Sequence, residues 1–127
     1  MTKSVLDASA ILTLLQGEPG SDTVMQYLPD AAVSAVNLSE VVAKLAEAGM
    51  PEKSIRTALT PFALDVWPFD EEAAYVCGQL RPQTRALGLS FGDRACLGLG
   101  LALSSTVVTT EQAWKSLGLG IKVVVAR

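Results

Sequence analysis

Histidine is absent from this sequence of 127 residues, and that absence excludes more chemistry than any other feature of its composition. A Ser-His-Asp triad, a Cys-His dyad, an H-E-x-x-H zinc helix and proton transfer by imidazole all need a side chain that the protein lacks. An enzyme with this sequence must therefore use carboxylates, lysine, hydroxyls, thiols or a metal ion bound through oxygen.

Cysteine is scarce as well, because Cys77 and Cys96 are the only two and do not form a C-x-x-C pair. Two thiols without histidine cannot complete a zinc site with four protein ligands, and they are too few for a disulfide scaffold. The sequence therefore predicts a protein of a reducing compartment, and we expect it in the cytoplasm.

Charged residues make up only 18% of the chain, and ten Lys and Arg against thirteen Asp and Glu give a net charge of −3. Half of the residues are hydrophobic, which excludes a disordered chain. The acidic balance argues against non-specific binding to a nucleic-acid backbone, although a local basic patch could still contact RNA. The longest uncharged stretch, residues 95–110, is too short to span a bilayer, so we expect no membrane segment.

Short apolar runs alternate with longer helical patterns, which predicts β/α units in one domain over residues 1–127. We expect an α/β/α sandwich around a short parallel sheet of about five strands, with helices on both faces. The expected strands lie at residues 4–6, 32–34, 64–67, 106–109 and 121–125. The expected helices pass through residues 11–15 and cover 21–28, 37–48, 52–59, 71–85, 91–103 and 111–117.

Four carboxylates share one type of position in this pattern. Asp7 and Glu111 directly follow expected strands, whereas Glu40 lies a few residues beyond one and Asp93 follows a Ser-Phe-Gly turn. In an open parallel sheet, the carboxyl ends of the strands and the first turns of the following helices line one edge, where ligands bind. All four carboxylates could therefore meet at that edge.

Taken singly, each acid also fits a helix cap. Residues 37–40 and 90–93 both match a capping box, Asp7 can be a plain N-cap, and Glu111 a first-turn acid favoured by the helix dipole. Taken together, four carboxylates repel one another, and a divalent cation removes that repulsion. Carboxylate oxygens select Mg²⁺ or Mn²⁺, and an acidic site of this kind is typical of phosphodiester hydrolysis.

Four short motifs occur in order along the chain: VLDASA at residues 5–10, NLSEV at 37–41, GDRACL at 92–97 and VTTE at 108–111. In order and spacing they resemble the PIN-domain family, most closely the VapC-type toxins of bacterial type II toxin–antitoxin modules. The resemblance implies an endoribonuclease that depends on Mg²⁺ or Mn²⁺ and leaves a 3′-OH and a 5′-phosphate. It also implies an RNA substrate, a VapB-type antitoxin that blocks the enzyme, and a homodimer.

By the same resemblance, Asp7, Glu40 and Asp93 match the three most regular acids of the family, which are metal ligands and catalytic residues. Glu111 stands where the family usually has aspartate, so its longer side chain would need a shifted metal or an intervening water. Ser9 matches a small polar position beside the first acid, where it is expected to hydrogen-bond a carboxylate or a water and to contact substrate.

Two arginines near the third motif, Arg85 and Arg94, are candidates for contacts with substrate phosphates. The alternative for both is a solvated position on a helix surface.

Two other functions stay open from the sequence. One is a PIN-like module that binds without catalysis. The other is a receiver-type signalling domain, which would want a phospho-accepting aspartate after the third strand, where this chain has Trp67-Pro68-Phe69.

Overall fold

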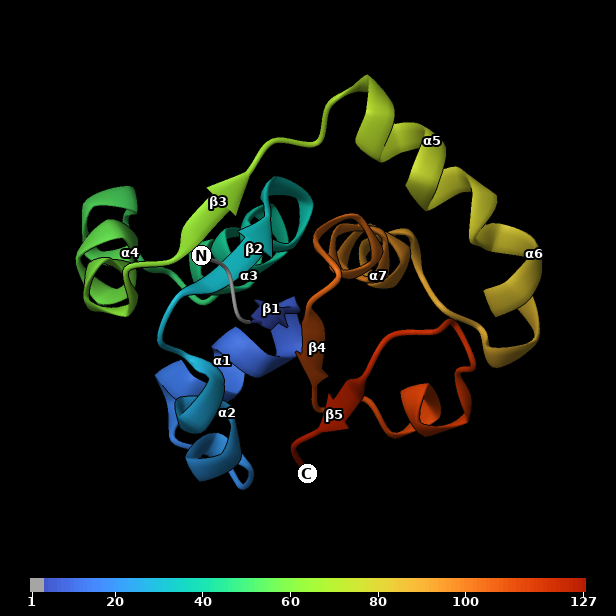
Figure 1. Ribbon diagram of the computed structural model, residues 1–127. Coiled ribbons are helices and arrows are strands. Elements are labelled where there is room, and N and C mark those ends of the chain that lie inside the picture. Colours follow the sequence, from blue (N-terminus) through green and yellow to red (C-terminus); the bar gives the residue numbers. More distant parts are fainter. Residues whose placement is uncertain (1–3) are drawn as a thin grey trace.

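The computed structural model describes residues 4–127, which form a three-layer α/β/α arrangement around one sheet (Figure 1). Every neighbouring pair of strands is parallel, and the order across the sheet is β3-β2-β1-β4-β5. The strands are β1 (Ser4–Leu6), β2 (Ala31–Ser34), β3 (Asp65–Trp67), β4 (Thr106–Thr109) and β5 (Val123–Val125). The expected parallel sheet of five strands with helices on both faces is confirmed.

Seven α-helices and three short 3₁₀ helices connect the strands within the described residues. The α-helices are α1 (Ala8–Gln16), α2 (Ser21–Tyr27), α3 (Ala35–Glu47), α4 (Glu52–Leu59), α5 (Glu71–Gln79), α6 (Arg81–Thr84) and α7 (Phe91–Leu103). The 3₁₀ helices are η1 (Thr60–Phe62), η2 (Arg85–Leu87) and η3 (Gln112–Ser116). Over residues 4–127, none of the helices has the length and apolar character needed to cross a membrane.

Several expected helix boundaries are confirmed, and three are wrong. The helix expected over 71–85 is broken into α5, α6 and η2, because Pro82 lacks an N–H and its ring would clash with the preceding turn of a continuous helix. Helix α3 begins at Ala35 rather than at residue 37, because the Ser34 hydroxyl accepts a hydrogen bond from the Val36 N–H and caps it. The helix expected over 111–117 is the shorter η3.

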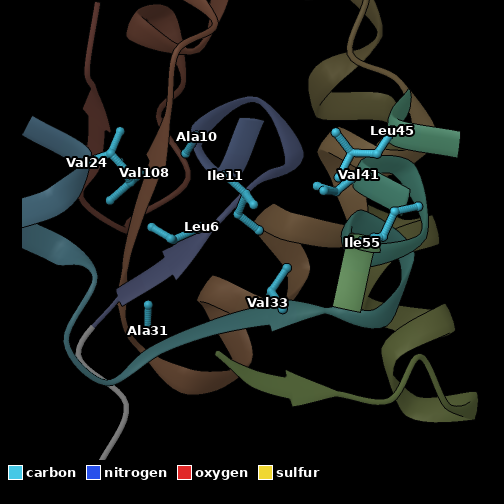
Figure 2. Packing of buried hydrophobic residues seen from close by; sticks show 10 residues of the cluster. All are labelled: Leu6, Ala10, Ile11, Val24, Ala31, Val33, Val41, Leu45, Ile55 and Val108. Atoms are coloured by element: carbon cyan, nitrogen blue, oxygen red, sulfur yellow. The ribbon is translucent and has the colours of Figure 1, made fainter. Parts of the chain in front are cut away.

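Side chains of the central strands alternate between two hydrophobic clusters, one on each face of the sheet. Leu6 of β1 and Val108 of β4 point to the face covered by α1 to α4, whereas Val5 and Val107 point to the face covered by α7 and η3. Figure 2 shows the buried residues of the first cluster: Leu6, Ala10, Ile11, Val24, Ala31, Val33, Val41, Leu45, Ile55 and Val108. Helix α5 packs against α7, outside the sheet (Figure 1).

Close packing of α7 on β4 depends on a glycine in the middle of the helix. A Cβ at Gly100 would overlap Cγ2 of the buried Val107. Glycine at this position therefore lets the helix backbone approach the strand closely. Gly100 thus allows α7 to pack directly on β4, the strand that leads to Glu111.

We expect Gly100→Ala to lower the free energy of unfolding by about 1–3 kcal/mol, because an added methyl group overpacks the contact with Val107. Gly78→Ala is the matched control, since Gly78 also lies in a helix but has open space around its Cα. The control is expected to gain up to about 1 kcal/mol from the higher helix propensity of alanine. Urea denaturation measures both, and equal stabilities would contradict the proposed close contact.

Candidate functional site

One pocket brings together the four acids predicted from the sequence. Asp7, Glu40, Asp93 and Glu111 all line a cavity of about 770 Å³, together with Ser9. Asp7 follows β1, Glu40 lies in α3 behind β2, Asp93 lies in the first turn of α7, and Glu111 follows β4. The pocket therefore lies at the carboxyl ends of the central parallel strands, the edge where such sheets bind ligands.

Asp7 is the most constrained of these acids, with only 3% of its surface exposed. Its Oδ1 accepts hydrogen bonds from the Ala10 N–H at 2.8 Å and the Ser9 hydroxyl at 2.7 Å. Its Oδ2 accepts one from the Thr109 hydroxyl at 2.5 Å. Burial raises the pKa of Asp7 to about 6, even though these three hydrogen bonds act to lower it, and the charge of Asp93 contributes to the rise.

Thr109 joins this network to the chain that follows β4. Its Oγ1 accepts the Glu111 N–H at 3.0 Å, and the Ser9 hydroxyl accepts the Thr110 N–H at the same distance. The Glu111 side chain itself is exposed and makes no capping bond. Sequence reasoning missed the role of Thr109. The sequence offered only a hydroxyl residue at the end of an expected strand. Its place beside Asp7 comes from the register of β1 and β4, in which Leu6 pairs with Val108.

Asp93 is part of a capping box and lines the pocket at the same time. Its Oδ2 accepts the Ser90 N–H at 2.9 Å, and its own N–H donates to the Ser90 hydroxyl at 3.2 Å. The capping box expected at residues 90–93 is therefore confirmed. The capping box expected at residues 37–40 is wrong, because both ends of that segment lie inside α3.

Glu40 is exposed to solvent, and its carboxylate is held by a neighbour one turn earlier in α3. The Asn37 side-chain amide donates to Oε1 of Glu40 at 2.9 Å and to the backbone carbonyl of Gly92 at 3.0 Å. Burial raises the pKa of the nearby Cys96 thiol, and the charges of Asp7, Asp93 and Glu40 raise it further. Three of the predicted acids therefore lie close enough to the buried Cys96 thiol to raise its pKa.

The basic residues at the pocket differ from the ones singled out in the sequence. Lys44 and Arg127 line the cavity, whereas Arg85 and Arg94 do not. Arg85 is exposed in η2, and the guanidinium carbon of Arg94 lies 6.0 Å from the centroid of the Phe91 ring. Lys44 follows Glu40 by four residues on α3, a spacing that places two side chains on the same face of a helix. That spacing was the signal that could have found it.

The donor set fits a hard divalent cation better than any other metal. The pocket offers carboxylates and hydroxyls and, with no histidine in the chain, no imidazole. In the described part of the chain, no three His, Cys, Asp or Glu side chains lie close enough to form a preformed cluster of ligands. Mg²⁺ commonly keeps several of its waters and is bound through only one or two carboxylates. Acids that are spaced apart around a solvent-accessible pocket can therefore bind it.

Asn37 provides a further polar atom at this pocket. Its Oδ1 is buried and has no hydrogen-bond partner among the described residues. Asp7, which lines the same pocket, is a buried carboxylate with a raised pKa, and a cation beside it would favour its charged form.

The PIN domain family model matches residues 4–118 of the sequence. The chain belongs to the PIN-domain family. No curated protein matches the sequence. The sheet order of this PIN domain, β3-β2-β1-β4-β5, also differs from the 2-1-3-4-5 order of receiver-type folds, so the receiver alternative is wrong.

Solved structures with this fold include toxin–antitoxin complexes. The DNA-bound VapBC of Salmonella typhimurium has a TM-score of 0.76 at 20% identity, covering 97% of both chains. A toxin–antitoxin complex from Klebsiella pneumoniae has a TM-score of 0.77 at 16% identity, covering 98% of both chains. FitAcB from Neisseria gonorrhoeae has a TM-score of 0.67 at 23% identity, covering 95% of this chain and 96% of that chain. At these identities the likeness shows that the PIN fold is shared.

The raised pKa of Asp7 predicts that this PIN domain is destabilised by its own site when no metal is present. Protonation of Asp7 favours the native state below about pH 4, and this contribution is lost as the pH rises through about 6. Above pH 6 the native state carries a desolvated carboxylate. We therefore expect Asp7→Asn to raise the free energy of unfolding in EDTA at pH 8 by up to about 3 kcal/mol, and by less at pH 5.

Asp70→Asn is the control for this prediction, because Asp70 is also an N-cap carboxylate but is exposed. It should show no comparable gain, since its charge stays in water. Urea denaturation at the two pH values measures the effect, and equal stability of Asp7→Asn and the unmodified protein at pH 8 would contradict the desolvation argument.

Proposed function

We propose that this protein is a divalent-metal-dependent endoribonuclease and the toxin of a VapBC-type pair. The observation that carries the proposal is the meeting of four carboxylates at one pocket of a chain without histidine. Imidazole cannot serve there as general acid or base, and a carboxylate site that holds Mg²⁺ or Mn²⁺ supports phosphodiester hydrolysis without it.

In this proposal Asp7, Glu40 and Asp93 hold Mg²⁺ or Mn²⁺, and Glu111 binds it directly or through a water. A cation held by these residues would supply Lewis-acid chemistry, activating a water and offsetting charge on the phosphate and the leaving oxygen. Asp7 stays oriented because three donors fix its two oxygens. Ser9 fixes one of those oxygens and lines the pocket, where it can also contact substrate.

The partners follow from the same proposal. The Salmonella and Klebsiella structures are described as a DNA-bound VapBC and a toxin–antitoxin complex, which supports a VapB-type antitoxin for this chain by analogy of fold. RNA as the substrate, a homodimer and a cytoplasmic location complete the proposal.

A second candidate is a PIN module that binds without catalysis. It is favoured by one observation, that two of the acids already serve as helix caps: Asp7 accepts from the Ala10 N–H and Asp93 from the Ser90 N–H. A cleavage experiment distinguishes the two candidates.

Purified protein is expected to cut a mixture of structured RNAs with Mg²⁺ or Mn²⁺ and not with EDTA. Asp93→Asn should reduce cleavage by more than about a hundredfold, because it removes a ligand charge. The amide oxygen of asparagine can still accept the Ser90 N–H, so the cap of α7 is retained and the variant should fold. Sequencing of the RNA ends checks for the 3′-OH and 5′-phosphate.

A fully active Asp93→Asn protein would end the nuclease assignment, since the activity would then belong to a contaminant or to another site. If no metal gives cleavage, calorimetry with Mn²⁺ decides between the candidates. Absence of metal binding would favour the non-catalytic module.

Lys44 is expected to contact a substrate phosphate, because it lines the pocket one helical turn from Glu40. Lys44→Gln should weaken RNA binding and reduce the slope of log affinity against log salt by about 0.7–1. Lys53→Gln, at an exposed position of α4 that does not line the pocket, is the control and should leave the slope unchanged. Fluorescence anisotropy at several salt concentrations measures both.

The double substitution Arg85→Gln with Arg94→Gln tests the phosphate contacts proposed from the sequence. Because neither arginine lines the pocket, contacts there require the RNA to extend over the surface around η2 and the start of α7. An unchanged affinity and salt slope would contradict that extension.

A further inference from the structure

Asn37 is an unusual residue for the interior of a helix that packs against a hydrophobic core. It lies in α3 with 1% of its surface exposed. A buried amide is costly unless its polar atoms are hydrogen-bonded. Its Nδ2 donates twice, to Oε1 of Glu40 at 2.9 Å and to the Gly92 carbonyl at 3.0 Å.

These two acceptors fix the orientation of the amide. A carboxylate oxygen and a carbonyl oxygen can only accept, so the nitrogen of Asn37 must face both of them. The Oδ1 that remains is buried without a hydrogen-bond partner among residues 4–127. For packing alone, an apolar side chain of similar size would cost less than a half-satisfied amide. Stability therefore does not account for asparagine at this position.

Gly92 meets the same carboxylate from the other side. A Cβ at Gly92 would overlap both carboxylate oxygens of Glu40. Gly92 lies in the first turn of α7, and glycine has a lower helix propensity than alanine. The missing side chain leaves the space that the Glu40 carboxylate occupies.

We propose that Asn37 and Gly92 are positioning residues for Glu40: the amide fixes one carboxylate oxygen, and the glycine leaves room for the group between α3 and α7. Glu40 is exposed and, within residues 4–127, accepts no backbone N–H bond, unlike Asp7 and Asp93. Asn37 and Gly92 therefore supply the orientation that its helix does not. The inference rests on the proposed function, because it assigns Glu40 as a ligand of Mg²⁺ or Mn²⁺.

Mn²⁺ binding by the full-length protein, measured by calorimetry and electron paramagnetic resonance, tests the proposal without relying on cleavage. Gly92→Ala should push the flexible Glu40 side chain away and weaken Mn²⁺ binding by about ten- to hundredfold. Asn37→Leu should weaken it similarly while leaving the melting temperature unchanged or higher. A purely structural role for Asn37 would instead lower the melting temperature and leave Mn²⁺ affinity unchanged.

Gly98→Ala is the matched control, because Gly98 is also a buried glycine of α7 but its added Cβ would approach Val76 and Cys77 of α5, not Glu40. It should keep Mn²⁺ affinity within about twofold of the unmodified protein. A double-mutant cycle gives the second control: in a Glu40→Gln background, Gly92→Ala and Asn37→Leu should cost no further affinity, because both act through the Glu40 carboxylate.

If the unmodified protein binds Mn²⁺ and both variants bind it equally well, this inference is overturned and the proposed function still stands. Losses that remain undiminished in the Glu40→Gln background would overturn it too, since the effect would then not pass through Glu40. If the unmodified protein binds no Mn²⁺, the proposed function is overturned, and this inference with it. If Asn37→Leu does not fold, Gly92→Ala carries the test alone.

Discussion

Burial of the Asp7 carboxylate is the constraint on which the site depends. A desolvated charge needs donors, and these come from two distant parts of the chain: the Ala10 N–H and the Ser9 hydroxyl in α1, and the Thr109 hydroxyl at the end of β4. The same hydroxyls accept the backbone N–H groups of residues 110 and 111. One buried charge thus ties β1, α1 and the chain after β4 into a single network.

The parallel sheet explains why this network lies at the carboxyl ends of the central strands. Because β1 lies between β2 and β4, the residue that follows it is flanked by the ends of two other strands. Helix α3 leaves β2 directly, and α7 is held close to β4 by Gly100. Glu40 and Asp93 are therefore delivered to the same edge from opposite faces, which no single strand or helix could achieve.

The sequence predicted what depends on local chemistry and missed what depends on distant partners. The five strands, the extent of 91–103 and the capping box at Ser90 all follow from patterns within a few residues. The break at Pro82 was also a local signal, but the prediction of one helix over 71–85 did not use it. Asn37 and Thr109 were missed, because their bonds reach residues 55 and 102 positions away, and only the folded chain places those residues beside them.

A helix cap and the proposed metal ligand, which were alternatives in the sequence, are compatible roles for one carboxylate in this fold. A cap places a carboxylate at a helix N-terminus, and in this topology that is also the edge of the sheet where ligands bind. Asp7 and Asp93 are oriented by backbone N–H groups because they cap. Glu40 lies within α3 and cannot cap it. An acid without that orientation needs side-chain support, and this is where the buried amide of Asn37 and the missing side chain of Gly92 occur.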